Sequence, residues 1–176
     1  MLIVITGGSA SGKSAHAEDM ICRYAPASRL YLATMEPFGA EARARIARHH
    51  ALRQGKGFET VEWYRGLPAL NLGKRYHGIL LECMSNLLAN EMFELQGCRE
   101  DAVPGILQGV KKLEAACSCL VVVTNEIFSD GLPYPVETVA YIDTLGRLNT
   151  ALAQMADAVA ESVCGILVPV KGAEFF

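Results

Sequence analysis

No apolar run in this 176-residue sequence reaches the roughly 18 residues that a transmembrane helix needs. Strand-like residues follow Met1 directly and leave no room for a signal peptide, so we expect a cytoplasmic protein without a membrane span. An excess of positive charge is also missing, because 16 Lys and Arg residues stand against 19 Asp and Glu residues, a net charge of −3. We therefore expect no nucleic-acid partner, and any anionic ligand must be held by a local basic cluster.

Metal-binding cysteine patterns are absent as well. The six cysteines form no C-x-x-C pair and no His/Cys cluster, which argues against zinc and favours reduced thiols. They are Cys22, Cys83, Cys98, Cys117, Cys119 and Cys164. The sequence has no internal repeat, low-complexity segment or interdomain linker, and its length suits a single domain over residues 1–176.

The clearest motif lies near the start of the chain, between an apolar run at 2–6 and an alanine-rich helical segment. It fits G-x-x-x-x-G-K-[ST], the phosphate-binding loop. Its residues are Gly7, Gly8, Ser9, Ala10, Ser11, Gly12, Lys13 and Ser14. The glycines let backbone N–H groups surround phosphate oxygens, Lys13 can reach the β- and γ-phosphates, and the Ser14 hydroxyl can ligate Mg²⁺. The motif predicts binding of a nucleoside triphosphate.

Strand-like and helix-like segments alternate along the rest of the chain. We predict strands at 2–6, 29–34, 58–63, 79–83, 120–126 and 166–170, helices at 40–53, 67–72, 85–95, 103–117 and 136–159, and a loop at 96–101. This alternation predicts an α/β fold, a mostly parallel sheet like that of P-loop NTPases with helices on both faces. Ligands of such sheets bind at the carboxyl ends of the strands, where the loop, Thr34, Glu82 and residues 124–126 would gather.

Glu82 ends an apolar strand, as the acidic residue of a Walker B strand does. Such a carboxylate supports Mg²⁺ beside the bound phosphates. Ser14 and Glu82 are therefore the predicted metal residues.

The helix at 40–53 is locally basic in an acidic protein. It carries Arg43, Arg45, Arg48, His49, His50 and Arg53. On composition alone this is a solvated basic face with two surface histidines. Alternatively, the arginines lie over a polyphosphate, and a neutral histidine attacks an α-phosphorus to form a phosphoramidate and release pyrophosphate.

Taken together, the ordered motifs resemble the bifunctional adenosylcobinamide kinase and adenosylcobinamide-phosphate guanylyltransferase family of cobalamin biosynthesis. The matches are I-T-G-G-x-x-S-G-K-S at 5–14, Y-L-A-T at 31–34, R-I-x-x-H at 45–49, T-V-E at 60–62, L-L-E-C at 80–83, V-V-T-N-E at 122–126 and G-R-x-N at 146–149. The resemblance implies that adenosylcobinamide is phosphorylated by a nucleoside triphosphate. The phosphate then takes GMP, derived from GTP, from a guanylyl-histidine to give adenosylcobinamide-GDP.

The resemblance also implies roles for individual residues. His49 would be the guanylylated residue, with His50 the alternative, and Lys13 would act in catalysis. Nucleotide contacts would fall on the loop residues 7–14 and on Ala33, Thr34, Met35, His50, Ala51, Leu52, Arg53, Glu62 and Glu82. ATP and GTP would be the substrates, Mg²⁺ the cofactor, and the protein a homo-oligomer, typically a trimer.

Three segments depart from the family pattern: Ala10 stands where many members have Arg, 54–57 is longer, and 127–135 differs and is expected to line the corrinoid site. Two other functions fit the motifs, a monofunctional small-molecule kinase and a non-catalytic nucleotide-binding regulatory protein. Two geometries fit as well. Either the helix at 40–53 approaches a triphosphate held by the loop, or the nucleotide binds in a second pose.

Overall fold

Seven strands form one sheet in the computed structural model, which describes residues 1–97, 102–129 and 131–176. The strands are β1 (Leu2–Gly7), β2 (Arg29–Ala33), β3 (Phe58–Glu62), β4 (Tyr76–Glu82), β5 (Cys117–Val123), β6 (Ala158–Val163) and β7 (Ile166–Lys171). Their order is β3-β2-β4-β5-β1-β6-β7, and only β7 runs antiparallel to its neighbour. The predicted mostly parallel sheet is confirmed.

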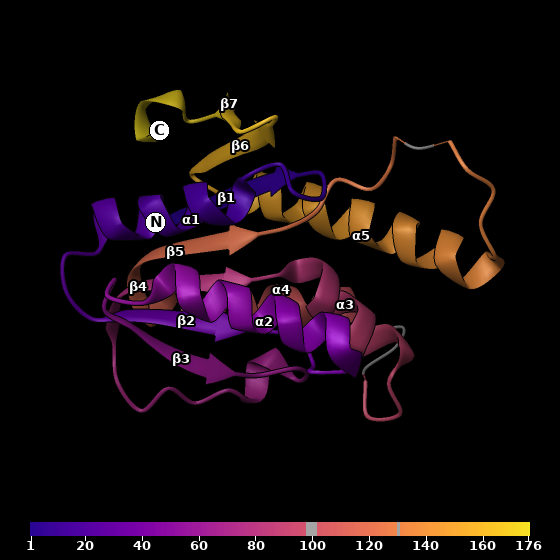
Figure 1. The fold of residues 1–176 in the computed structure, drawn as a ribbon, viewed down its shortest axis with the longest axis horizontal. Helices are drawn as coiled ribbons and strands as arrows, with labels where there is room; N and C mark the ends of the chain where they lie inside the picture. Colours follow the sequence, from indigo (N-terminus) through magenta and orange to yellow (C-terminus); the bar gives the residue numbers. More distant parts are fainter. Residues whose placement is uncertain (98–101, 130) are drawn as a thin grey trace.

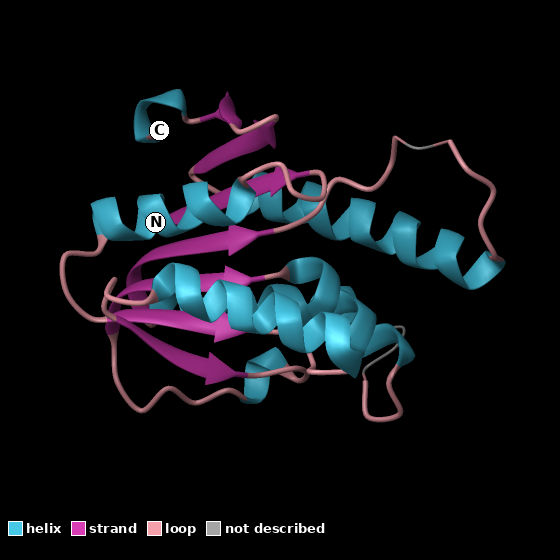
Figure 2. Ribbon diagram, in the orientation of Figure 1, coloured by secondary structure: helices cyan, strands magenta, loops and turns pink. Residues whose placement is uncertain are grey.

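Helices cover both faces of this sheet (Figure 1, Figure 2). They are α1 (Lys13–Tyr24), α2 (Gly39–Arg53), α3 (Met84–Phe93), α4 (Ala102–Ala115) and α5 (Val136–Met155), with 3-10 turns η1 (Leu67–Ala69) and η3 (Ala173–Phe175). α1 packs on β1, β4 and β5, whereas α4 packs on β5 from the other face. α5 extends past the carboxyl ends of the strands (Figure 1).

The central strands are apolar because both of their faces are buried. In β1, Leu2, Ile3 and Ile5 have no exposed surface, and in β5 the run from Leu120 to Val123 has none either. Alternate residues of each strand join different core clusters, one beneath α1 and one beneath α4 and α5. Continuous apolar runs of this kind are typical of parallel strands that are covered on both sides.

The predicted helix at 136–159 is wrong in its last turn. α5 ends at Met155, and residues 158–163 form β6, a strand that we did not predict. Ala and Glu in this stretch favour a helix locally, but the tertiary position overrides that preference. Asp157 lies beside the start of β1, where its N–H donates to the Leu2 carbonyl (2.9 Å) and its carboxylate accepts from the Leu2 N–H (2.8 Å).

Other boundaries shift by a few residues. β4 begins earlier than predicted, at Tyr76, and β5 runs from Cys117 to Val123 rather than over 120–126. The predicted helix at 67–72 is only the single turn η1. Residues 98–101 of the predicted loop, with Cys98, lie outside the described residues, and the five described cysteines are free thiols. Within the described ranges, no helix is both long and apolar enough to cross a membrane.

Candidate active site

Register across the sheet aligns the predicted site residues along its carboxyl edge. Glu62 of β3 pairs with Ala33 of β2, and Ala33 pairs on its other side with Glu82 of β4. Glu82 in turn pairs with Val123, which pairs with Ile5 of β1, just before the phosphate-binding loop. Glu82 is thus separated from the loop strand by one strand, whereas Glu62 lies on the far edge strand β3.

The phosphate-binding loop joins β1 to α1 and has the backbone shape that its glycines permit. A Cβ on Gly7, at φ +151°, would lie 2.6 Å from the Ser162 carbonyl oxygen, so no larger residue fits there. The Lys13 ammonium donates to the Gly8 carbonyl at 2.8 Å and so folds back over the loop. Burial lowers the pKa of Lys13. The lysine is therefore already at the place where a bound phosphate chain would pass.

The β6–β7 hairpin holds this loop by hydrogen bonds to its Ser11 carbonyl. Ser162 donates from its hydroxyl to the Ser11 carbonyl (2.7 Å), and the Gly165 N–H donates to the same oxygen (2.9 Å). Both Cys164 (φ 51°) and Gly165 (φ 81°) have positive φ, as a two-residue hairpin turn requires. The sequence signal for this turn was Cys164-Gly165 between the apolar residues Val163 and Ile166. Our sequence reasoning missed both this turn and β6.

Glu82 is the point where four elements meet. Its Oε1 accepts a hydrogen bond from the Ser14 hydroxyl of α1, and the same oxygen lies 3.8 Å from His49 Nδ1 of α2. Its Oε2 accepts from the Tyr31 hydroxyl of β2 at 3.2 Å. The side chains of His49 and Glu82 are only 15% and 10% exposed. The structure therefore brings the loop serine and His49 to one carboxylate.

His49 is held in a setting that favours the neutral imidazole. Burial lowers its pKa, with further lowering by Arg53 and Arg48, against the opposing effect of Glu82. Its Nδ1 is buried and has no hydrogen-bond partner among the described residues. A neutral imidazole keeps a free lone pair on one ring nitrogen, which is the form that acts as a nucleophile.

Most of the basic helix α2 is exposed, but Arg53 at its carboxyl end is buried. Arg43, Arg45, Arg48 and His50 are exposed, and Arg45 pairs with Glu41 on the surface at 2.9 Å. Arg53, by contrast, is 5% exposed, and its guanidinium carbon lies 3.3 Å from the centroid of the Tyr31 ring. Arg53 therefore packs against Tyr31 of β2, and His49, one turn earlier on the same face of α2, lies near Glu82.

An ion pair between a partly exposed lysine and a buried glutamate holds the residues that follow α2. Lys56 Nζ lies 2.6 Å from Oε2 of Glu18, a residue of α1 that is 1% exposed. Our sequence reasoning assigned no role to Tyr31 or Glu18. A tyrosine inside a buried strand and a glutamate on the apolar face of a helix both require polar partners, and that requirement was the signal.

The remaining predicted residues lie in two places. The Thr34 hydroxyl is fully engaged with the Cys83 backbone, donating to its carbonyl and accepting from its N–H, so it joins β2 to β4. Met35 follows it and is half-buried, and the exposed Glu62 accepts a hydrogen bond from the Tyr64 hydroxyl at 2.6 Å. His50, Ala51 and Arg53 line a pocket of about 610 Å³ at the end of α2, and Leu52 is exposed beside them.

Ser14 and Glu82 fit a magnesium ion by the chemistry of their donors. Mg²⁺ takes oxygen ligands and commonly only one or two from protein, with phosphates and water completing its shell. A hydroxyl and a carboxylate already in contact offer that set. The described residues contain no group of three or more His, Cys, Asp or Glu side chains that could hold a metal by themselves.

Comparison with known proteins gives a consistent result. The family model described as cobinamide kinase / cobinamide phosphate guanyltransferase matches residues 3–170. The bifunctional adenosylcobalamin biosynthesis protein CobU of Salmonella typhimurium is 36% identical, over 97% of this chain and 100% of that protein. The protein of the same name from Escherichia coli is 33% identical over the same shares.

A solved structure supports the fold. An ATPase from the type III secretion system of pathogenic bacteria superposes with a TM-score of 0.55 at 14% identity, covering 96% of this chain and 57% of that one. At that identity the likeness concerns the fold alone, and it confirms the predicted P-loop NTPase-like architecture.

Proposed function

This chain belongs to the cobinamide kinase / cobinamide phosphate guanyltransferase family, and we propose that His49 carries the guanylyl group between its two transfers. The family resemblance inferred from the motifs is confirmed. The protein is a transferase that phosphorylates cobinamide and attaches a guanylyl group to the product. Family membership leaves no place for the non-catalytic alternative.

The observation that carries the proposal is the shared contact of Glu82 with Ser14 and His49. A triphosphate held by the loop would have its phosphates beside Ser14. The His49 imidazole would then also be near these phosphates, because His49 and Ser14 lie beside the same Glu82 carboxylate. This favours the geometry in which α2 approaches a nucleotide on the loop. It gives no reason to invoke a second nucleotide pose.

Covalent transfer through His49 balances in two displacements. In the first, the imidazole lone pair forms a bond to the α-phosphorus of GTP while the bond to the bridging oxygen breaks and pyrophosphate leaves. In the second, an oxygen of cobinamide phosphate attacks that phosphorus, and the P–N bond electrons return to the imidazole. A proton on Nδ1, the nitrogen that lies 3.8 Å from Glu82, would leave the lone pair of Nε2 free to attack.

For the kinase step, we propose that Lys13 neutralises charge on the β- and γ-phosphates while the loop N–H groups hold them. Ser14 and Glu82 would hold Mg²⁺, which supplies further positive charge to the phosphates. ATP or GTP would serve as the phosphoryl donor. The nucleotide contacts proposed for residues 33–35, 50–53 and Glu62 rest on the family resemblance, and so do a trimeric assembly and a cytoplasmic location.

Labelling with α-labelled GTP and Mg²⁺ tests the proposal. We expect acid-labile, base-stable label on the peptide that contains His49, and none from γ-labelled GTP. Because burial lowers the pKa of His49, the labelling rate should fall on acidification with a midpoint below about pH 6.5, the ordinary value for histidine. Label on His50, or a rate that already declines between about pH 8 and 7, would contradict it.

Tyr31→Phe tests whether the tyrosine positions Glu82. The variant keeps the ring beneath Arg53 and removes only the hydroxyl that donates to Glu82. We expect the rate of His49 labelling to fall about tenfold, the effect of losing one hydrogen bond to a charged group of about 1.5 kcal/mol. Quench-flow time courses measure the rate, and thermal unfolding serves as the control for folding. An unchanged rate would remove Tyr31 from the site.

A further inference from the structure

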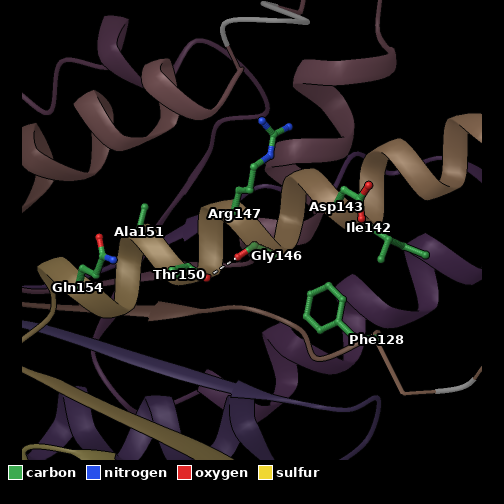
Figure 3. Close-up of a pocket in the computed structure, with 8 residues that line it drawn as sticks. All are labelled: Phe128, Ile142, Asp143, Gly146, Arg147, Thr150, Ala151 and Gln154. Atoms are coloured by element: carbon green, nitrogen blue, oxygen red, sulfur yellow. Dashed lines mark hydrogen bonds between the residues drawn. The ribbon is translucent and has the colours of Figure 1, made fainter.

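A groove on α5 lies outside the site described so far. Figure 3 shows it between α5 and the segment that follows β5, with Phe128 facing the helix near Gly146. Its volume is about 470 Å³. The residues that shape it are Phe128, Ile142, Asp143, Gly146, Arg147 and Thr150. A Cβ on Gly146 would lie 3.8 Å from the Phe128 ring, in van der Waals contact with it, so a longer side chain there would occupy the groove.

Hydrogen bonds tie one wall of the groove to the phosphate-binding loop and the other wall to the end of β5. The Glu126 N–H donates to the Gly7 carbonyl at 3.1 Å, and the Glu126 carboxylate accepts from the Phe128 N–H at 2.8 Å. On the helix side, Asn149 of α5 accepts from the Thr124 hydroxyl at 2.6 Å, at the end of β5. Phe128, which forms one wall of the groove, is therefore only two residues from Glu126, the residue that contacts the loop.

The chemistry of the groove suits a bulky, uncharged and amide-bearing ligand. Phe128 and Ile142 offer apolar surface, and Asp143 and Arg147 together contribute no net formal charge. The Asp143 carboxylate offers acceptors, and the Arg147 guanidinium, which also donates to the Thr144 hydroxyl at 3.0 Å, offers donors. Exposed apolar side chains continue beyond it at Val136 and Val139. A second nucleotide would need an excess of cations for its phosphates, and this groove has none.

We propose that this groove binds the corrin ring of cobinamide, so that the alcohol arm extends to the phosphate-binding loop. The inference rests on the family's kinase activity. A corrin ring has methyl-rich faces, which match Phe128 and Ile142. Its rim carries primary carboxamides, whose N–H and C=O groups match Asp143 and Arg147. The groove also lies at the carboxyl edge of the sheet, the side from which an acceptor must reach the γ-phosphate.

Gly146→Leu tests the groove directly, because it places a side chain between α5 and Phe128. Gly105→Leu is the matched control, since Gly105 is also within a helix and a Cβ there meets nothing within 4 Å. Equilibrium dialysis with dicyanocobinamide measures binding without turnover. We expect Gly146→Leu to raise the Kd about tenfold and Gly105→Leu to leave it unchanged.

A second variant guards against misfolding. Phe128 is 44% exposed, so Phe128→Ala should fold, and we expect it also to weaken dicyanocobinamide binding about tenfold. Labelling of His49 by GTP should remain at the wild-type rate in both groove variants, which separates this inference from the proposed guanylyl intermediate. Equal Kd values in wild type, Gly146→Leu and Phe128→Ala would overturn the inference, and so would absence of binding by the wild type.

Discussion

Replacing His49 with alanine is expected to abolish guanylyl transfer while phosphorylation of cobinamide continues. The variant removes the only proposed acceptor of GMP, and a missing nucleophile typically costs about a thousandfold or more in rate. The kinase step should fall by less than about threefold, because Lys13 and the loop N–H groups remain in place. The measurement follows two products from one reaction, cobinamide phosphate and the GDP derivative, with separately labelled ATP and GTP.

His50→Ala is the matched control for this prediction. His50 is the neighbouring histidine on α2 but is exposed, whereas it is His49 that lies beside Glu82. We expect it to keep guanylyl transfer within about threefold of wild type. If His50→Ala lost the transfer and His49→Ala kept it, His50 would be the guanylylated residue. The contact of His49 with Glu82 would then serve structure alone.

Replacing Lys13 with methionine is expected to stop both transfers. Methionine keeps much of the length and apolar stem of lysine but removes the positive charge beside the loop. Loss of one preorganised charge at a phosphate typically lowers the rate about a thousandfold. The guanylyl step should be lost as well, because Ser14 and His49 share Glu82 and a GTP that reacts with His49 would use the same loop.

Lys111→Met supplies the control, since Lys111 is an exposed residue of α4 on the opposite face of the sheet from α1. It should leave both rates at the wild-type level. The informative comparison is between the two variants. His49→Ala should lose guanylyl transfer alone, whereas Lys13→Met should lose both guanylyl transfer and the kinase step. Full labelling of His49 in Lys13→Met would show that GTP reacts from a second pose.

Local sequence determined the parts of the site that lie within one stretch of chain. The loop at 7–14 could be recognised because Gly7 and Gly12 take backbone conformations that favour glycine, and its phosphate chemistry requires Lys13 and Ser14. Glu82 could be placed because an apolar run that ends in a carboxylate is visible by itself. The family resemblance selected His49 over His50, and its roles for the individual site residues stay predictions.

Only the tertiary structure decided how these pieces meet. Tyr31 and Ser14 both reach Glu82 across long stretches of sequence, and no local pattern encodes such a contact. Local sequence could not show which histidine of α2 turns inward, because that depends on which face of the helix lies toward Tyr31 and Glu82. β6 was missed because Ala and Glu favour a helix locally, whereas pairing with β1 on one side and β7 on the other stabilises a strand.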